Sequence, residues 1–360
     1  MGMFEFYVSG YAKPGEKGIM KCAFDGKVVD VLDSNDELHN PSWVLHHPDK
    51  PLLYAVEELT PEGSLAVLSE EDGHLKMIAR VSTGGADPCH ISITPDNRYL
   101  MVSNYTSGSS LAVYELDQNG IPKLMTDYIQ HRMDGRQKGN PVRQEAPHIH
   151  FSLCDRNNVY VNDLGMNKVF IYDWDSERGR LIDRRKFLDF PDGSGPRHLV
   201  FSKDGHYLYV LCELNATIHV FQKLGNAGWR RRHVVSTVPE DFEDFQKYDW
   251  SIAAAIHFVD SRTLCASNRG HNSLAVFSVD GSGQLSNRQI IPSGGETPRD
   301  FMITDGFLLI ANQGRGAVSI FNKTLDCYCT TGIILKANYP TCICKTVQRP
   351  CSIDLSRPSR

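Results

Sequence analysis

Residues 87–117 read DPCHISITPDNRYLMVSNYTSGSSLAVYELD. The stretch contains three short runs rich in apolar residues, and polar sequences such as TPDN and TSGS separate them. Alternation of apolar and polar residues predicts half-buried β-strands, and Asp, Asn, Gly and Pro are typical of the turns between strands. The stretch therefore predicts an antiparallel module that begins at a proline.

The same module recurs along the chain, so the protein is predicted to be built from repeats. Further copies occupy residues 40–70, 146–175, 195–223, 253–280 and 297–323. Their first strands align at positions 42 to 59 residues apart, namely Pro41, Pro88, Pro147, Pro196, Ala253, Pro298 and Pro340. The last copy, YPTCICKTV, has only a first strand. Its missing strands are expected near the amino terminus, in FEFYVSGY, GIMKCAFD and KVVDVLD.

Repeats of about 40 to 50 residues with four short strands each are typical of β-propeller blades. We therefore predict an all-β fold, a seven-bladed β-propeller of four-stranded blades with one blade shared between the N- and C-termini. Sharing that blade closes the ring and removes exposed edge strands. The propeller is expected to form a single domain over residues 1–360, with residues 348–360 as an unassigned tail. Repeated Trp-Asp endings are absent, which excludes a WD-type propeller.

Charge and composition exclude several classes of partner. The chain carries 38 Lys and Arg against 43 Asp and Glu, a net charge of -5, so no nucleic-acid partner is expected. No apolar run reaches the roughly 18 residues of a membrane-spanning helix, and the start of the chain lacks the features of a signal peptide. We therefore expect a cytoplasmic protein with no membrane partner. Its oligomeric state is left open, and a monomer is compatible with the sequence.

The ten cysteines are expected to be reduced thiols in such a compartment. Cys327 with Cys329, and Cys342 with Cys344, imitate a four-thiolate site, but structural zinc sites usually separate their ligands by two to four residues. His148 lies two residues from His150, and no third ligand is evident. The sequence therefore predicts no metal and no organic cofactor.

Strand direction indicates where a site can form. The starts of the first strands and the ends of the second strands must share one end of the ring, around its axis. Charged and polar residues that a strand does not need for packing gather at these positions: His90, Asn104, His148, Asp163, Arg197, His198, Glu213, Asn268, Arg269, Arg299, Asn312 and Gln313. Such a convergence predicts a small-molecule site at a central mouth.

The motifs QEAPHIH, GSGPRHL, SNRGHNSLAVF, GGETPRDF and IANQG together resemble the propeller lactonase family. That family contains bacterial 6-phosphogluconolactonases and the fungal carboxy-cis,cis-muconate lactonizing enzyme, and the resemblance extends from Phe4 to about Val347. It implies a lactonase that acts on a small anionic lactone, a phosphosugar, by hydrolysing 6-phospho-glucono-δ-lactone to 6-phosphogluconate in the pentose phosphate pathway. The catalytic residues that it implies are His148, Arg197, Glu213 and Arg269. Ala255 departs from the family, where this position is often acidic.

The residues themselves suit this chemistry. His148 can take a proton from the attacking water, and Glu213 can orient the histidine or hold that water. Arg197 and Arg269 can stabilise an oxyanion or grip an anionic substrate. The other candidates for substrate binding are His90, Asn104, Asp163, His198, Asn268, Arg299 and Gln313. For His90 and His198 a hydrogen bond to a neighbouring blade is the favoured interpretation. For Asn268, Arg299 and Gln313 a structural role at the rim is the alternative.

Other functions stay open. The same residues could serve another lactonase or a carboxymuconate-type cycloisomerase, and a propeller can also bind a protein partner without catalysis. Two long connections lie at the predicted mouth. Residues 131–144 either form a solvated loop, or contact a substrate phosphate or close over the mouth. Residues 240–250, EDFEDFQKYDW, are expected to pack onto the ring through their aromatic side chains.

Overall fold

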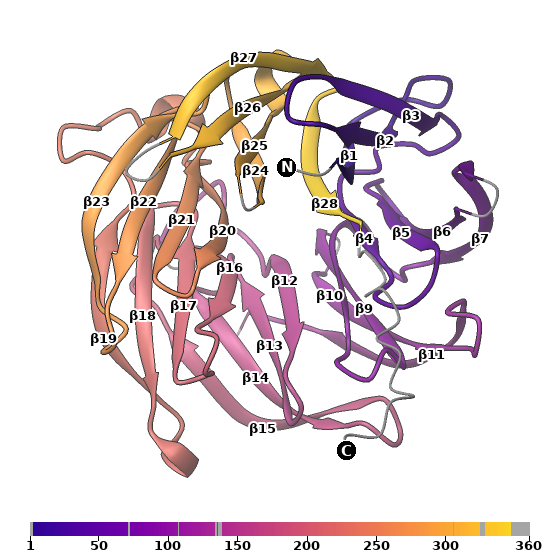
Figure 1. Cartoon of the computed structure of the whole chain (residues 1–360). Coiled ribbons are helices and arrows are strands. Elements are labelled where there is room, and N and C mark those ends of the chain that lie inside the picture. Colours follow the sequence, from indigo (N-terminus) through magenta and orange to yellow (C-terminus); the bar gives the residue numbers. More distant parts are fainter. Residues whose placement is uncertain are drawn as a thin grey trace, which may run out of the picture.

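The computed structural model describes residues 3–70, 73–106, 108–133, 135, 139–304, 306–324 and 328–346. Seven four-stranded antiparallel sheets surround a central axis (Figure 1), so the seven-bladed all-β fold predicted from the repeats is confirmed. Helix in the described part of the chain is limited to short 3-10 turns at η2 (Gly225–Ala227), η3 (Gln246–Tyr248) and η4 (Gln313–Arg315).

Each blade runs outward from the axis. Blade 1 has the order β28 (Pro340–Lys345), β1 (Phe4–Gly10), β2 (Ile19–Phe24), β3 (Val29–Asn35). Blade 2 consists of β4 (Val44–His46), β5 (Leu52–Glu57), β6 (Ser64–Ser69) and β7 (Lys76–Ser82). Blade 3 consists of β8 (Ala86–Ile93), β9 (Tyr99–Thr106), β10 (Ser110–Leu116) and β11 (Pro122–Gln130). Blade 4 consists of β12 (Ile149–Cys154), β13 (Asn158–Asp163), β14 (Lys168–Asp175) and β15 (Arg180–Asp189).

The remaining three blades follow in chain order. Blade 5 consists of β16 (Pro196–Phe201), β17 (Tyr207–Cys212), β18 (Thr217–Lys223) and β19 (Trp229–Ser236). Blade 6 consists of β20 (Ala253–Asp260), β21 (Thr263–Asn268), β22 (Ser273–Val279) and β23 (Leu285–Pro292). Blade 7 consists of β24 (Pro298–Ile303), β25 (Phe307–Asn312), β26 (Ala317–Lys323) and β27 (Tyr328–Lys336).

The two ends of the chain close the ring in blade 1, as predicted. β28 pairs with β1 in the register Tyr7 to Cys344 and Val8 to Ile343, and Figure 1 shows the yellow β28 beside the indigo β1. The pairing joins residues at least 330 positions apart in the sequence. The predicted tail, residues 348–360, lies outside the described residues.

The first-to-second-strand turns are held by short aspartate side chains. Oδ1 of Asp155 accepts hydrogen bonds from the amides of Asn157 and Asn158, both at 2.7 Å, and Asp204 accepts from the amide of His206 at 3.0 Å. Local bonds of this kind explain why Asp, Asn and Gly recur there. These turns lie at the end of the ring opposite the predicted mouth.

The hydrophobic core is divided among the spaces between neighbouring blades. Between blades 7 and 1, for example, Phe24 and Phe307 pack edge to face with their ring centroids 4.9 Å apart. Full burial of one such side chain contributes about 1.5–3 kcal/mol. Each blade therefore depends on both of its neighbours, and the polar mouth is held by an apolar ring.

One backbone hydrogen bond repeats around the ring and fixes the equivalence of the blades. In each of these blades, the residue that follows the second strand donates its backbone amide to a carbonyl at the entry to the inner strand of the same blade. The described bonds are Tyr11 to Tyr339, Glu58 to Asn40, Leu164 to His148, Glu213 to Gly195, Arg269 to Ile252 and Gln313 to Thr297. His148 is therefore equivalent to Gly195, and not to Arg197.

This equivalence corrects one of the predicted anchors. In blade 4 the inner strand begins at Ile149, which pairs with Asp163 as Pro196 pairs with Cys212. The anchor at Pro147 is therefore wrong by two residues. Pro147 belongs to the long connection that enters blade 4, and its position just before a strand imitates the other anchors.

Candidate active site

The mouth of the ring is built from one repeated position, the residue at the end of each second strand. Backbone pairing places the following residues there: Tyr11, Glu58, Tyr105, Leu164, Glu213, Arg269 and Gln313. Because the blades are related by rotation about the axis, these residues form one circle. The sequence prediction that second-strand ends meet at the axis is confirmed for Glu213 and Arg269, which touch.

The next layer comes from β-bulges in the inner strands. The register skips one residue in several blades, which leaves Cys89, His150, Arg197 and Arg299 without a partner on the second strand. A bulge of this kind re-aims a side chain. Sγ of Cys89 lies 3.9 Å from Nδ1 of His150, so bulged residues of neighbouring blades approach one another.

Glu213 is the centre of a buried cluster of arginines. Its Oε2 lies 2.9 Å from Nε of Arg197 and 2.8 Å from Nη2 of Arg269, and its Oε1 lies 2.6 Å from Nη2 of Arg143. The side chain of Glu213 is 1% exposed, that of Arg197 2% and that of Arg269 8%. Three guanidinium groups on one carboxylate leave the cluster with a net positive charge.

The charges in this cluster shift one another's pKa values. Burial would raise the pKa of Glu213, but the charges of Arg269, Arg143 and Arg197 outweigh it and hold the pKa well below its usual range. Burial and the neighbouring charge of Arg269 lower the pKa of Arg197 to about 9, which still leaves it charged at neutral pH. The site therefore presents ionised groups of both signs.

The cluster also contains buried donors without an acceptor. Nη1 of Arg197 donates to the carbonyl of Ala254 at 2.7 Å, and Nη2 of Arg269 donates to the carbonyl of Ala253 at 3.1 Å. The Nε–H groups of Arg197 and Arg269 are buried, and neither makes a hydrogen bond to an acceptor among the described residues. Nε of Arg197 is close to Oε2 of Glu213, but the contact lacks the alignment of a hydrogen bond. Buried donors in this state are uncommon and suit a ligand oxygen.

His148 lies beside this cluster and makes a different set of contacts from the one predicted. Its Nδ1 is 3.0 Å from the carbonyl oxygen of Tyr105, and its Nε2 is 2.9 Å from Oε1 of Glu145. The ring of Tyr105 stacks on it at 4.4 Å. Both ring nitrogens face acceptors, so both hydrogen bonds form together only when each nitrogen carries a proton.

The expected contact between Glu213 and His148 is therefore not found. Glu213 is fully engaged with arginines, and Glu145 takes the place beside the histidine. The Nδ1 bond to a backbone carbonyl fixes that nitrogen as a donor, which leaves Nε2 as the nitrogen that exchanges a proton. Glu145 is 51% exposed, so solvent reaches this side of the ring.

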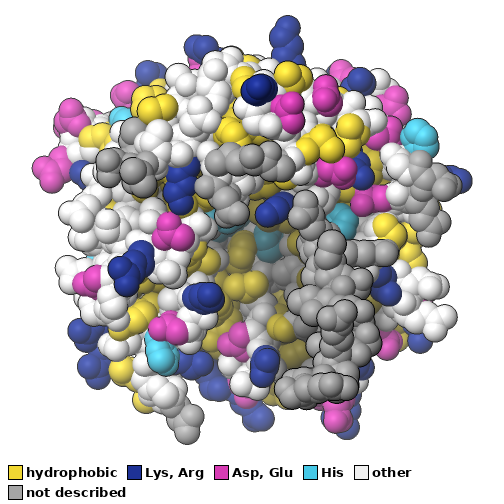
Figure 2. Space-filling model, viewed as in Figure 1, with side chains coloured by type: hydrophobic (Ala, Val, Ile, Leu, Met, Phe, Trp, Pro, Cys, Tyr) yellow, Lys and Arg dark blue, Asp and Glu magenta, His cyan; other side chains and the backbone are white. Residues whose placement is uncertain are grey.

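Three other histidines surround the axis in neutral form. Burial and the charge of Arg197 lower the pKa of His90 to about 3, and the same causes hold the pKa values of His150 and His198 well below the usual range. Nε2 of His198 lies 2.9 Å from Nη1 of Arg197, and the ring of His90 packs 4.1 Å from that of Phe151. Figure 2 shows the centre of the ring hollowed, with hydrophobic and histidine side chains inside.

Two of the predicted substrate-binding residues form hydrogen bonds to the connections between blades. Asn104 and Asn268 are fully buried, and their side-chain amides donate to the carbonyls of Thr83 and Thr237, at 3.0 and 2.8 Å. These carbonyls belong to the chain that passes from one blade to the next. Both asparagines therefore fix a crossover, and their assignment to substrate is corrected because their amides point into the backbone of the preceding connection.

Asp163 has a similar structural role. Its Oδ1 accepts from the amides of His148 and Met166, at 2.8 and 3.0 Å, and its Oδ2 lies 2.6 Å from Nδ1 of His131. The side chain is fully buried. Asp163 therefore ties down both ends of the connection that carries His148 and does not reach the mouth.

Arg299 forms a second group of residues with Glu58. Its guanidinium carbon lies 5.2 Å from the ring centroid of Tyr11, and its Nη1 is 3.4 Å from Oε1 of Gln313. Tyr11 donates to Oε1 of Glu58 at 2.7 Å, and Oε2 of Glu58 is buried without a hydrogen bond among the described residues. Arg299 and Gln313 thus lie together at the mouth, as predicted.

Several of these residues were not among the predicted site residues. Glu145, Tyr105, His150, Tyr11 and Glu58 all line the mouth or support it. Glu145 and His150 stand inside the quoted QEAPHIH motif, so that motif held a signal for them. Tyr105, Tyr11 and Glu58 occupy the same repeated position as Glu213, at or just after the end of a second strand, and could have been found from it.

The two long connections meet over Glu213. Arg143, from residues 131–148, donates from Nη1 to the carbonyl of Asp249 at 3.3 Å. The second connection packs through Phe242, Phe245 and Tyr248 onto a small apolar cluster around Ile252, so its predicted packing through aromatic side chains is confirmed. Both connections are therefore part of the site's surroundings.

Ala255 and the cysteines of β27 and β28 are not among the residues that form the mouth. Ala255 is fully buried in the apolar cluster between blades 6 and 7. Cys342 and Cys344 lie on β28 at the axis, whereas Cys329 lies exposed on the outermost strand β27. Cys327 is outside the described residues. Within the described ranges, no three His, Cys, Asp or Glu side chains are arranged to hold a metal ion.

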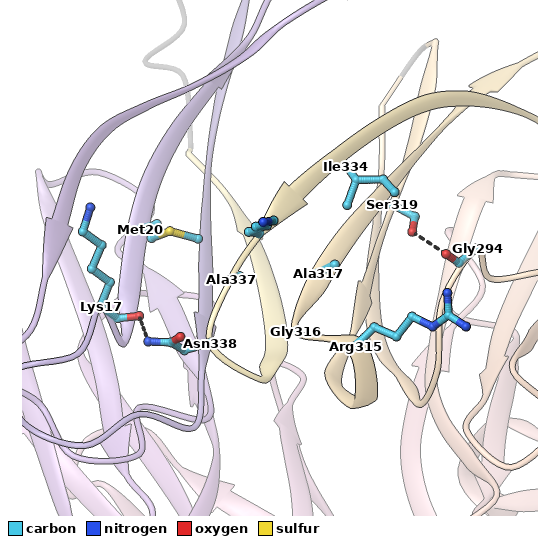
Figure 3. A pocket seen from close by; sticks show the side chains of 11 residues that line it. Lys17, Met20, Gly294, Arg315, Gly316, Ala317, Ser319, Ile334, Ala337 and Asn338 are labelled. Atoms are coloured by element: carbon cyan, nitrogen blue, oxygen red, sulfur yellow. Dashed lines mark hydrogen bonds between the residues drawn. The ribbon is translucent and has the colours of Figure 1, made fainter.

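A separate groove of about 550 Å³ lies between blades 7 and 1 (Figure 3). Met20 and Ile334 form part of its wall, and Lys17 and Arg315 stand at opposite sides in the view. None of the predicted site residues lines it. No helix in the described segments is long and apolar enough to cross a membrane.

Seven blades around a mouth of buried arginines define a propeller suited to binding a small anion at its axis. Residues 5–342 match the family described as "Lactonase, 7-bladed beta-propeller", and the chain belongs to that family. The family assignment made from the motifs is confirmed, and the protein is a lactone-hydrolysing enzyme.

Three known proteins illustrate the similarity. The 6-phosphogluconolactonase of Bacillus subtilis is 29% identical over 94% of this chain and 97% of its own. That of Formosa agariphila is 32% identical over 87% of this chain and 90% of its own. The solved structure of the periplasmic gluconolactonase PpgL from Pseudomonas aeruginosa is 27% identical, with a TM-score of 0.87 and coverage of 96% and 99%.

Proposed function

We propose that this lactonase hydrolyses 6-phospho-glucono-δ-lactone to 6-phosphogluconate, in the pentose phosphate pathway and in the cytoplasm. The observation that carries the proposal is the excess of positive charge at the mouth. Arg143, Arg197 and Arg269 share the single carboxylate of Glu213. A site with uncompensated arginines favours a substrate that brings its own negative charge, as a phosphate ester does.

The buried donors supply the electrostatic part of the reaction. When water attacks the lactone carbonyl, negative charge develops on the carbonyl oxygen. The Nε–H groups of Arg197 and Arg269 are already buried and have no acceptor in alignment among the described residues, so they can receive that charge with little rearrangement. Glu213 keeps both guanidinium groups in place because it binds them on its Oε2.

His148 supplies the proton transfer. Glu145, which contacts Nε2 and is half exposed, moves aside so that water reaches this nitrogen. With Nδ1 fixed by the carbonyl of Tyr105, Nε2 of the neutral ring takes a proton from the attacking water as the carbon–oxygen bond forms. The tetrahedral intermediate then opens the ring, and the same proton goes to the departing ring oxygen. Lactone and water become one hydroxy acid, and His148 returns to its starting state. This scheme asks for no cofactor.

A second candidate substrate is an unphosphorylated gluconolactone, which the similarity to PpgL favours. The two substrates share the ring that reacts and differ only in the remote phosphate. The catalytic roles of Arg197, Arg269 and His148 would be the same for both, so the difference lies in what recognises the phosphate.

A direct assay separates these candidates. 6-Phosphogluconolactone and glucono-δ-lactone are generated immediately before use, and ring opening is followed by proton release at pH 6.5 to 7, against the spontaneous rate. We expect acceleration of both, with the larger kcat/KM for the phosphorylated lactone. The variant Arg197→Gln, which removes one of the oxyanion donors, should lose activity. That loss would show that the activity does not come from a contaminating lactonase. Equal rates with and without protein, for both lactones, would contradict the proposal.

A further inference from the structure

Arg143 is the one member of the Glu213 cluster that does not belong to the repeated blade structure. It lies in the connection between β11 and β12, whereas Arg197 comes from an inner strand and Arg269 from the end of a second strand. Its side chain is 21% exposed, against 2% for Arg197 and 8% for Arg269. An incoming ligand therefore meets Arg143 before it reaches the two deeper arginines.

The backbone that carries Arg143 is rigidly held. The amides of Val142 and Arg143 donate to Oδ1 of Asn140, at 2.9 and 3.0 Å. Gln144 donates from Nε2 to the carbonyl of Leu164 at 2.8 Å and to Oδ1 of Asn167 at 2.7 Å. This connection is tied to blade 4 by buried hydrogen bonds. The direction of the Arg143 side chain is therefore set by its surroundings.

Three different parts of the ring accept hydrogen bonds from this guanidinium group. Nη2 donates to Oε1 of Glu213 at 2.6 Å and to Oη of Tyr105 at 3.2 Å, and Nη1 donates to the carbonyl of Asp249 at 3.3 Å. Asp249 and Trp250 both have left-handed backbone, with φ of 49° and 59°. Such backbone is unfavourable for these residues, and here it accompanies a carbonyl turned toward Arg143.

We infer that Arg143 determines specificity by recognising the remote anionic group of the substrate. The inference rests on the proposed lactone hydrolysis and adds which residue selects the phosphorylated substrate. Among the described residues, the buried Nε–H of Arg269 has no acceptor, and that of Arg197 lies 2.9 Å from Oε2 of Glu213 without making a hydrogen bond; the proposed mechanism places the carbonyl oxygen at these two groups. A phosphate at the far end of the same sugar then lies toward the solvent side, where Arg143 is the partly exposed cation of the Glu213 cluster.

The contacts of Arg143 explain how it discriminates. Its planar guanidinium can bind two phosphate oxygens at once, which a point charge cannot do. Without it, one positive charge is lost at the outer side of the mouth, while Glu213 still has Arg197 and Arg269 on its Oε2. The reacting end of the site is therefore retained, and only the recognition of charge at the remote end is lost.

The test compares two lactones and three variants. For Arg143→Gln we expect KM for 6-phosphogluconolactone to rise about tenfold to a hundredfold, because one charge-assisted hydrogen-bonded contact is removed. KM for glucono-δ-lactone should change less than about threefold, and kcat for both should stay near wild type. For Arg143→Lys we expect a KM for 6-phosphogluconolactone between those of wild type and Arg143→Gln, since lysine keeps the positive charge but loses the planar guanidinium group.

The matched control is Arg156→Gln, which removes one positive charge from an exposed turn at the opposite end of the ring. It should leave both KM values unchanged, which separates local recognition from general attraction. An equal loss for both lactones in Arg143→Gln, or an unchanged ratio of their kcat/KM values, would overturn the inference. Failure of the proposed function looks different, because wild-type protein would then accelerate neither lactone.

The same question can be asked without turnover. Binding of the product 6-phosphogluconate, followed by calorimetry, should weaken in Arg143→Gln and stay unchanged in Arg156→Gln. Gluconate, which lacks the phosphate, should bind the wild type and Arg143→Gln with the same affinity. A variant that binds 6-phosphogluconate as tightly as wild type would remove Arg143 from recognition.

Discussion

Nη2 of Arg269 and Oε2 of Glu213 lie 2.8 Å apart, and both side chains are almost completely removed from solvent at the mouth of the ring. Breaking a buried pair by neutralising one partner leaves a buried charge without compensation. We expect Glu213→Gln to lower the free energy of unfolding by about 3–5 kcal/mol, because the three arginines lose the carboxylate that they share. Chemical denaturation measures this, with the exposed Glu177→Gln as control. A change below about 1 kcal/mol would show that the cluster is not a stabilising unit.

Glu213 also predicts how stability depends on pH. Burial opposes ionisation, but the charges of Arg269, Arg143 and Arg197 hold the pKa of this carboxyl group well below its usual range. Ionised Glu213 therefore contributes stability above the unfolded pKa of about 4.3, and that contribution is lost as the pH falls toward the folded value. Below about pH 5, the denaturation midpoint should fall more steeply in wild type than in Glu213→Gln. Parallel curves would contradict the linkage.

His148→Asn tests the proton transfer. Asparagine keeps a polar group of similar reach beside the carbonyl of Tyr105 but cannot exchange a proton near neutral pH. We expect kcat to fall about a hundredfold or more, with little change in melting temperature. His206→Asn, on an exposed turn, is the control for removing a histidine. Full activity in His148→Asn would exclude the residue from the reaction.

Arg269→Lys tests the role of a free Nε–H. Lysine keeps the charge beside Glu213 but has no second donor at the Nε position. If this donor stabilises the oxyanion, kcat should fall about a hundredfold while KM changes little. If Arg269 instead holds the substrate's anionic group, KM should rise with kcat near normal. Steady-state kinetics with the phosphorylated lactone distinguishes the two roles.

Removal of the closing strand should unfold the protein. A chain that ends at Tyr339 lacks β28, so β1 has no inner partner and the apolar cluster that includes Ile343 is opened. We expect it to aggregate or to melt far below wild type, because an unpaired strand edge is exposed. A chain that ends at Thr346 retains every described strand and should melt like the full chain. Normal melting of the shorter chain would contradict the role of β28.

The fold could be predicted from the sequence because each blade repeats the same order of strands and turns. The site could be predicted only where its residues occupy a repeated position, as Glu213 and Arg269 do at the ends of second strands. The connection that enters blade 4 misled the alignment, because Pro147 imitates an anchor and the inner strand begins at Ile149. A single sequence cannot show how far such a connection runs before the repeat resumes.

Contacts between blades were the hardest part to predict. Glu145 was overlooked beside His148, and the asparagines Asn104 and Asn268 were assigned to substrate although they bond the backbone of the preceding connection. In each case the partner lies on a different segment of the chain. Polar residue types at the mouth can be recognised from sequence, but whether they face a ligand or a neighbouring blade depends on side-chain directions that only the structure provides.

The pairing of β28 with β1 has a consequence for how the protein is made. The innermost strand of the first blade is synthesised after every other described strand, so a growing chain carries an incomplete first blade until β28 appears. At about 5–20 residues per second, this wait is on the order of tens of seconds. During that time β1 and the open side of blade 7 present unpaired edges and apolar surface. Ring assembly is thus a late step of biosynthesis, and protection of the nascent chain by chaperones should matter most before it.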